Sequence, residues 1–177
     1  MGYTLNTTNE YHRQRLQSLG WELTVCNALY PENSLCRSVL KSNASFGEHL
    51  FDFLSRLIPF SALRNVLEVG GGLGYLMKDL LRLAPHLQAT MLDISPFLLQ
   101  KQMEALAGLP VRFVEMDFLK VTTAQIHSFD LAIFNENLGD FPTLVYNPAS
   151  SKEDTEVASR SLNKIFDYEE EYSLEFT

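Results

Sequence analysis

The sequence predicts an α/β fold, with a doubly wound, mostly parallel sheet and helices on both of its faces. Between residues 65 and 134, short apolar segments alternate with longer amphipathic ones. Parallel strands need a crossover connection, usually a helix, so this alternation favours a parallel sheet. The last apolar segment, residues 129–134, is nearly all apolar. That composition is typical of a strand buried on both faces.

Length and composition limit the class of protein. The 177 residues suit one domain with a short appendage, and the formal net charge of −8 disfavours nucleic acid as a partner. The sequence has no run of 18 apolar residues, the length that a membrane span needs, and its N-terminus lacks the pattern of a secretory signal. We therefore expect a cytoplasmic protein with no membrane partner. Two cysteines, Cys26 and Cys36, and four scattered histidines do not predict a metal site.

The first 44 residues are predicted to form a helical cap, beginning at a capping box formed by Thr7 and Glu10. A second capping box, Ser45 with Glu48, starts the next helix, which Pro59 is expected to end. The apolar positions that we place on one face of that helix are Phe46, Leu50, Phe53, Leu54 and Leu57.

The alternating elements follow in residues 45–150, the main domain. The predicted strands cover residues 65–69, 89–92, 111–116 and 129–134. The first crossover helix spans residues 75–83 and is stopped by Pro85. The second begins with Ser95 as its N-cap and Pro96 at its first position, and Gly108 follows its C-terminus.

Residues 151–177 are predicted to be an acidic helix and tail. Residues 152–177 hold eight acidic and three basic side chains, a net of −5. A helix is expected from Ser151 to about Tyr168, and residues 172–176 are a candidate fifth strand. The acidic run at 169–171 is either a solvated face or an interaction tail.

Residues 66–75 form the motif that is most informative about function. An apolar strand with Glu68 near its end leads into a turn with glycines at 70, 72 and 74, and a helix follows. Glycine lets the backbone bend sharply and lets a ligand lie against it, while the helix start offers free N–H groups. The dinucleotide fingerprint G-x-G-x-x-G/A fails, because Tyr75 and Met77 occupy its third small position in the two registers.

The pattern E-x-G-x-G-x-G, matched by Glu68, Gly70, Gly72 and Gly74, resembles motif I of the class I (Rossmann-like) S-adenosylmethionine (SAM)-dependent methyltransferases. The resemblance covers about residues 45–142. It implies SAM as the cofactor, with Glu68 near the methionine ammonium and the glycines giving close backbone approach. It also implies a seven-stranded sheet in the order 3-2-1-4-5-7-6, of which this chain supplies four clear strands.

Three further strand ends fit this family. The resemblance implies that Asp93, followed by Ile94, binds the ribose hydroxyls, and that Asp117 binds the adenine amine with Phe118 beside the ring. The alternative from the residues alone is that Asp93 is an acid favoured at a helix N-terminus and Asp117 a loop acid. Residues 129–137 resemble motif IV.

Asn135 and Glu136 are the candidate catalytic residues, because they follow the fourth strand, whose end faces the substrate in this family. Asn135 offers a backbone carbonyl to the cofactor and an amide to the acceptor, and Glu136 could orient or deprotonate the acceptor. The alternative is that the segment simply forms a turn before Pro142.

We therefore expect a methyltransferase acting on an unidentified acceptor, a small molecule or a protein side chain. Two alternatives stay open: a non-catalytic SAM-binding or interaction module, and a nicotinamide or flavin enzyme. The C-terminal strands of the usual sheet look incomplete, which leaves residues 129–134 as an apolar edge. We expect either the tail or a second copy of the chain, in a homodimer, to cover that edge.

Overall fold

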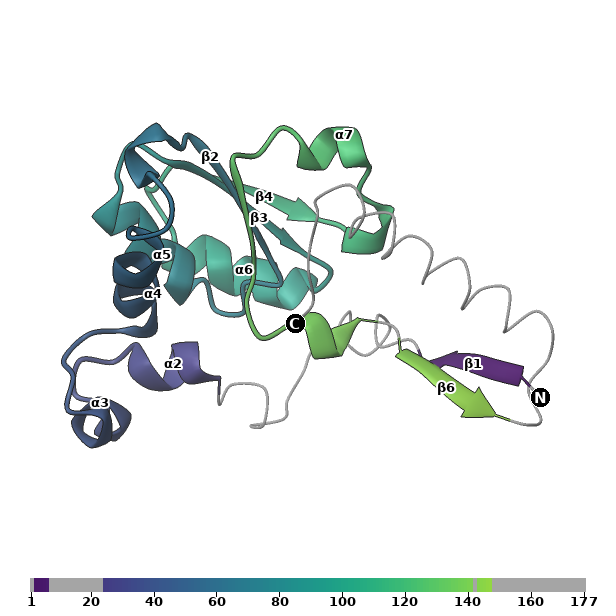
Figure 1. Cartoon of the computed structure of the whole chain (residues 1–177), viewed down its shortest axis with the longest axis horizontal. Coiled ribbons are helices and arrows are strands. Elements are labelled where there is room, and N and C mark those ends of the chain that lie inside the picture. The colour runs from purple at the N-terminus through teal and green to yellow at the C-terminus, as the bar shows by residue number, and fades with distance from the viewer. Residues whose placement is uncertain (1, 7–23, 142, 148–177) are drawn as a thin grey trace.

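The main body is a four-stranded parallel sheet, seen in the computed structural model of residues 2–6, 24–141 and 143–147 (Figure 1). Its strand order is β4-β3-β2-β5. The strands are β2 (Asn65–Val69), β3 (Gln88–Asp93), β4 (Val111–Glu115) and β5 (Leu131–Phe134). The predicted α/β class is confirmed, and the order matches strands 3-2-1-4 of the expected sheet.

The register brings the carboxyl ends of the strands to one edge of the sheet. Val69 of β2 lies opposite Leu92 of β3 on one side and Phe134 of β5 on the other. On the outer side of β3, Asp93 lies opposite Glu115. Ligands of open α/β sheets bind at this edge, so the pairing places the predicted site residues where a pocket is expected.

Helices cover the sheet on both faces. One face packs α4 (Phe46–Leu54), α5 (Tyr75–Leu83) and the end of α6 (Pro96–Ala105) on alternate strand residues such as Val66 and Met91. The other face, with Leu67 and Val69, packs against the short α7 (Thr123–Ile126) and the 3-10 turn η2 (Phe118–Lys120). Within the described part of the chain, this second face has the thinner cover.

Local signals explain most of the helix boundaries. α5 spans the predicted residues, and Gly74 at its N-cap has a left-handed φ of 82°. Ser95 caps α6 by accepting from the Leu98 N–H, with Pro96 at the first position, as predicted. Gly108, with φ of 80°, follows that helix.

The prediction for α4 is correct at its start and wrong at its end. Ser45 and Glu48 form the predicted capping box. The helix stops at Leu54, five residues before Pro59, so Leu57 lies beyond it and is 65% exposed. Phe53 is 58% exposed, although the pattern assigned it to the buried face. Phe46, Leu50 and Leu54 pack on the core cluster as expected, and Phe51, which the pattern did not assign to the buried face, packs there as well.

The described part of the N-terminal region, residues 24–44, contains two short helices, α2 (Val25–Leu29) and α3 (Leu35–Leu40). The expected capping box of Thr7 and Glu10 lies outside the described residues. Residues 2–6 form a strand, β1, that the sequence analysis did not predict, and it pairs antiparallel with β6 (Thr143–Asn147). These two strands make a separate sheet.

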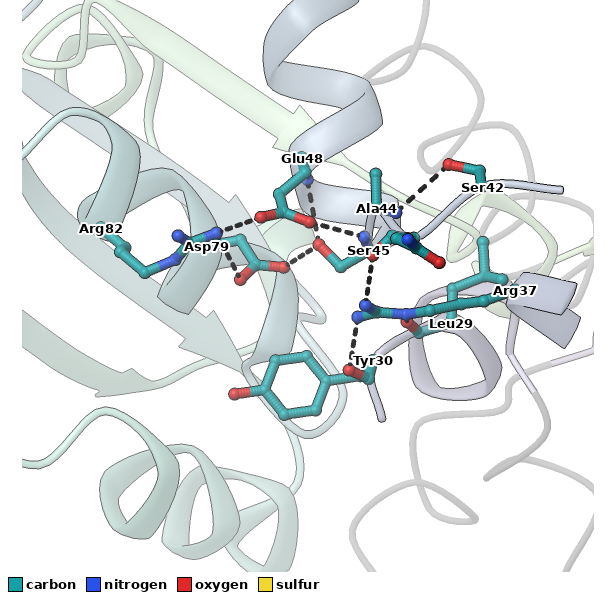
Figure 2. A network of polar contacts seen from close by, with 10 residues as sticks. Leu29, Tyr30, Arg37, Ser42, Ala44, Ser45, Glu48, Asp79 and Arg82 are labelled. Atoms are coloured by element: carbon teal, nitrogen blue, oxygen red, sulfur yellow. Dashed lines mark hydrogen bonds and ion pairs between the residues drawn. The ribbon is translucent and has the colours of Figure 1, made fainter. Parts of the chain in front are cut away.

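A buried arginine holds α2 and α3 together (Figure 2). The Arg37 guanidinium, in a residue only 7% exposed, donates to the carbonyls of Leu29 at 2.6 Å, Tyr30 at 2.7 Å and Asn43 at 2.5 Å. The bonds to Leu29 and Tyr30 satisfy carbonyls at the end of α2, which the helix itself leaves unpaired. The Tyr30 ring stacks on Tyr75 of α5 at 3.8 Å between centroids.

A second set of polar contacts joins α4 to α5 (Figure 2). The Ser45 hydroxyl donates to Asp79 Oδ2 at 2.5 Å, and Arg82 pairs with Glu48. Burial raises the pKa of Asp79 despite these contacts. The backbone N–H of Ser45 lowers the pKa of Glu48.

Within the described residues, the outer side of β5 has no partner strand. After β5 the chain passes through the 3-10 turn η3 (Leu138–Asp140). The next strand, β6, pairs with β1 and not with β5. The predicted tail helix and fifth strand lie outside the described residues, so the covering of this edge stays a prediction. The described helices include none long and apolar enough to cross a membrane.

Gly47 tests the α4–α5 contact. A Cβ at this position would lie 2.5 Å from the Asp79 Cβ, closer than carbon atoms pack. We expect Gly47→Ala to lower the free energy of unfolding by about 1–3 kcal/mol, the usual cost of overpacking. Gly139→Ala, where a Cβ would meet nothing within 4 Å, is the matched control. Equal stability of both variants in urea unfolding would contradict this packing.

Candidate functional site

The glycine turn after β2 is the centre of the site. Gly70, Gly72 and Gly74 have φ of 62°, 53° and 82°, the left-handed region that side chains disfavour. The Gly70 N–H donates to the Leu92 carbonyl at 2.8 Å, and the Gly74 N–H to the Gly71 carbonyl at 2.8 Å. The turn therefore depends on glycine for its shape.

The middle of this turn is open on one side. A Cβ at Gly70 would lie 2.9 Å from Asn137 Nδ2, and one at Gly74 would lie 3.3 Å from Leu106. A Cβ at Gly72 would meet no atom of the described residues within 4 Å. Gly72 is thus the position where a ligand can lie directly against the backbone.

Two buried side-chain amides hold the carbonyls of the turn. Asn137, 7% exposed, donates through Nδ2 to the Val69 carbonyl. Gln102 of α6, fully buried, donates through Nε2 to the Gly72 carbonyl at 3.0 Å and to Asp93 Oδ2 at 2.9 Å. The turn is therefore fixed from β5 on one side and from α6 on the other.

A pocket of about 280 Å³ lies over the turn. Its walls come from α2, the end of β2, the starts of α5 and α6, and the loop after β5. The lining residues are Thr24, Cys26, Asn27, Glu68, Gly70, Gly71, Gly72, Leu76, Leu98, Asn135, Glu136, Asn137 and Asp140. Five residues of the predicted site, Glu68, Gly70, Gly72, Asn135 and Glu136, are brought together here.

Glu68 is a buried carboxyl group in this pocket. The residue is 2% exposed, and its Oε2 has no hydrogen-bond partner among the described residues. Burial, with a smaller contribution from the negative charge of Asp93, raises the pKa of Glu68 to about 8. A buried acid without a donor is costly in a strand. Its position therefore indicates a ligand that supplies a donor or a positive charge.

Asp93 lies at the predicted strand end, but its carboxylate does not line the pocket. The residue is 4% exposed, and Oδ1 accepts from the Ser95 N–H at 2.9 Å while Oδ2 accepts from Gln102. Ile94 follows it and is also outside the lining set. A carboxylate oxygen can accept more than one donor, so these two bonds by themselves do not exclude a ligand hydroxyl.

Asp117 and Phe118 also lie outside the pocket lining. Asp117 Oδ1 accepts from the Leu119 N–H at 3.0 Å and so caps η2. The Phe118 ring meets Phe134 edge-on at 4.8 Å, on the thinner face of the sheet. In this arrangement both residues have local structural partners.

Glu136 has an unusual backbone. Its φ is 55°, one of two positive values among the described non-glycine residues, the other being Lys41. A left-handed conformation costs a non-glycine residue roughly 1–2 kcal/mol. The side chain is exposed at the pocket, and Asn135 Nδ2 lies 3.5 Å from its Oε2. Strained residues of this kind cluster at functional sites.

Sequence reasoning missed the wall that α2 contributes, with Thr24, Cys26 and Asn27. Burial, aided by the negative charges of Glu68, Asp79 and Glu136, raises the pKa of the Cys26 thiol to about 12. Sequence reasoning also left Gln102 out of the site. A signal was present, because Gln102 is a polar residue in the apolar stripe Leu98–Gln102–Leu106, spaced four apart.

The described residues contain no group of three or more His, Cys, Asp or Glu side chains arranged to hold a metal ion.

Comparison with known proteins agrees with this geometry. Residues 66–148 match the sequence model of a family described as a methyltransferase domain. The matched segment is similar to that family, and the class I, Rossmann-like resemblance is confirmed. No curated protein sequence gives a significant match.

Several solved structures are similar over part of the chain. Mitomycin 7-O-methyltransferase is 30% identical, with 36% of this chain and 20% of that chain covered and a TM-score of 0.33. SAM-bound CalS10, an amino pentose methyltransferase from Micromonospora echinaspora, is 18% identical, with coverages of 67% and 45% and a TM-score of 0.42. Human N-acetylserotonin methyltransferase in complex with SAM is 23% identical, with coverages of 51% and 29% and a TM-score of 0.32.

This chain therefore matches 20% to 45% of the length of these three proteins.

The buried carboxyl of Glu68 predicts a pH dependence of stability. An unfolded glutamate titrates near 4.5, so between about pH 4.5 and 8 the folded protein keeps a proton that the unfolded chain has lost. Stability therefore falls as pH rises through this window, by up to about 1.4 kcal/mol per pH unit from this group. Glu68→Gln removes that loss. Urea unfolding of both proteins at several pH values measures it, and parallel pH profiles would contradict the burial.

Proposed function

We propose that this chain binds SAM across the turn at residues 70–74 and transfers its methyl group to an acceptor that is a small molecule or a protein side chain. The single observation that supports this most combines two features of one pocket: among the described residues, nothing covers the open side of Gly72, and Glu68 Oε2 has no hydrogen-bond partner. The residues present fit the cofactor, because its backbone needs close approach to glycine and its ammonium needs an acceptor.

We assign the cofactor contacts as follows. Glu68 takes the methionine ammonium, and Gly70, Gly72 and Gly74 give backbone approach. Asp93 with Ile94 binds the ribose, and Asp117 with Phe118 binds the adenine. Asn135 offers its backbone carbonyl to the ammonium. The pocket supports the contacts of Glu68, Gly70, Gly72 and Asn135, which line it. The role of Gly74 and the ribose and adenine contacts are supported by the resemblance alone.

SAM, when bound, supplies an electrophilic methyl group on a positively charged sulfur. The chain's own part is to align the acceptor with that methyl group and to exclude water, which accounts for most of the catalysis in such a transfer. Asn135 and Glu136 are the proposed catalytic residues. The Asn135 amide orients the acceptor, and the Glu136 carboxylate holds or accepts its proton.

A second candidate is a non-catalytic SAM-binding or interaction module. It is favoured by the sheet of four parallel strands in the described residues, where the resemblance implies seven. Cofactor binding without methylation of any acceptor supports this candidate. The methyltransferase proposal carries two further expectations, a cytoplasmic location and a homodimer formed through β5.

Gly72 provides the direct test. Gly72→Leu should weaken binding of S-adenosylhomocysteine (SAH), the demethylated product, at least tenfold, because the side chain occupies the ligand's space. Gly108→Leu is the matched control: it has the same left-handed backbone and an equally open Cβ direction, and it does not line the pocket. Both substitutions should cost a similar roughly 1–2 kcal/mol in stability.

Isothermal titration calorimetry measures both affinities, with NAD as a competing ligand class. Tighter binding of NAD than of SAH, or equal SAH affinity of the two leucine variants, would overturn the proposal.

A further inference from the structure

The pocket has a second buried acceptor besides Glu68. Asn137 lines the pocket and is 7% exposed, and its Oδ1 has no hydrogen-bond partner among the described residues. Glu68 Oε2, in the same lining, is in the same state. Buried acceptors are normally paired, so an unpaired one calls for a donor from elsewhere. Glu68 is already assigned to the cofactor's ammonium, and the oxygen of Asn137 is left to be explained.

The other end of the Asn137 amide fixes its orientation. Nδ2 donates to the Val69 carbonyl. Rotating the amide by half a turn would place Oδ1, which carries no proton, against that carbonyl oxygen, and two acceptors repel each other. Oδ1 and Nδ2 therefore cannot exchange places, and the unpaired oxygen is a consequence of the fold.

Asn137 also lacks the usual local bond of an asparagine at a helix start. It occupies the N-cap of η3, where its side-chain oxygen would normally accept from a backbone N–H of the first turn, yet it makes no such bond. The Asn137 backbone carbonyl accepts from the Asp140 N–H at 3.0 Å, so the turn is closed without the side chain. The side-chain oxygen therefore has no part in the turn that it begins.

The two unpaired acceptors flank consecutive residues of the glycine turn. A Cβ at Gly70 would lie 2.9 Å from Asn137 Nδ2, and a Cβ at Gly71 would lie 3.1 Å from Glu68 Oε2. The Cα atoms of such neighbours are about 3.8 Å apart across a trans peptide bond. The amide and the carboxyl group are therefore packed against the same short stretch of backbone, which brings both to the same part of the pocket.

A count of donors shows what this oxygen can bind. An ammonium group has three N–H donors. Glu68 and the Asn135 carbonyl are assigned to two of them, which leaves one N–H without an acceptor. Asn137 Oδ1 supplies the third, and all three residues line the pocket. Burial raises the pKa of Glu68 to about 8, whereas an amide oxygen does not titrate, so Asn137 accepts whether that acid is neutral or charged.

We propose that Asn137 is a further cofactor-binding residue, whose Oδ1 accepts a hydrogen bond from the cofactor's ammonium and makes the pocket selective for ligands that carry an amine there. This inference rests on the proposed function and adds a specificity-determining residue to it. In the alternative, Asn137 serves only the fold, through the Val69 carbonyl, and its loss weakens all ligands of the turn alike.

The test compares SAH with its deamino analogue, adenosylthiobutyrate, in which a hydrogen atom replaces the amino group. Calorimetry on the full chain gives the ratio of the two affinities, the amine preference. We expect wild-type protein to bind SAH more tightly and Asn137→Ala to lower the amine preference about tenfold, because one hydrogen bond to a charged group is lost. If thermal unfolding shows that Asn137→Ala is not folded, Asn137→Ser, whose shorter side chain keeps a polar group, takes its place with the same expected fall.

Gln102→Ala is the matched control. Gln102 is also a buried amide that holds a carbonyl of the turn, and its Oε1 also has no partner among the described residues, but it does not line the pocket. This variant should leave the amine preference unchanged, even where it weakens both ligands.

The outcomes separate this inference from the proposed function. If SAH binds but the Asn137 variant weakens both ligands equally, or weakens neither, the inference alone is wrong. The same holds if wild-type protein binds both ligands with equal affinity, or if Gln102→Ala lowers the amine preference as much as Asn137→Ala does. Absence of SAH binding to the wild-type protein removes the proposed function, and this inference with it.

Discussion

Two buried amide side chains set the position of the glycine turn, and the rest of the site depends on them. Asn137 holds the Val69 carbonyl, and Gln102 holds the Gly72 carbonyl together with Asp93. Each such bond contributes about 1 kcal/mol net, but a buried carbonyl left without it costs roughly 1–3 kcal/mol. Because the donors come from the loop after β5 and from α6, the turn takes its shape only when both have packed.

The pocket combines features that oppose stability. Glu68 is a carboxyl group in the most buried strand of the sheet, and Glu136 has a left-handed backbone. The surrounding core compensates, because α5 and the sheet bury a continuous set of leucines, valines and methionines. Natural proteins depart from local rules mainly at functional sites, and here both departures line one pocket.

The N-terminal helices contribute to the site as well as to the fold. Arg37 donates to the Leu29 and Tyr30 carbonyls at the end of α2 and to the Asn43 carbonyl after α3, and the Tyr30 ring stacks on Tyr75 of α5. The other end of α2 then lies over the pocket, with Thr24 and Cys26 in its wall. A substitution of Arg37 would therefore alter the ligand site indirectly, by changing the position of α2, although Arg37 itself does not line the pocket.

The amino-acid sequence was sufficient for the parallel strands, for α5 and α6, and for the glycine turn with Glu68. Apolar runs, capping residues and glycines act within a few residues, so they leave a local record. Packing alone settled that Asp93 turns inward to Ser95 and Gln102, that α2 lines the pocket, and that Phe53 faces solvent. Those features depend on contacts between segments tens of residues apart, and neither periodicity nor spacing encodes which distant partner a side chain meets.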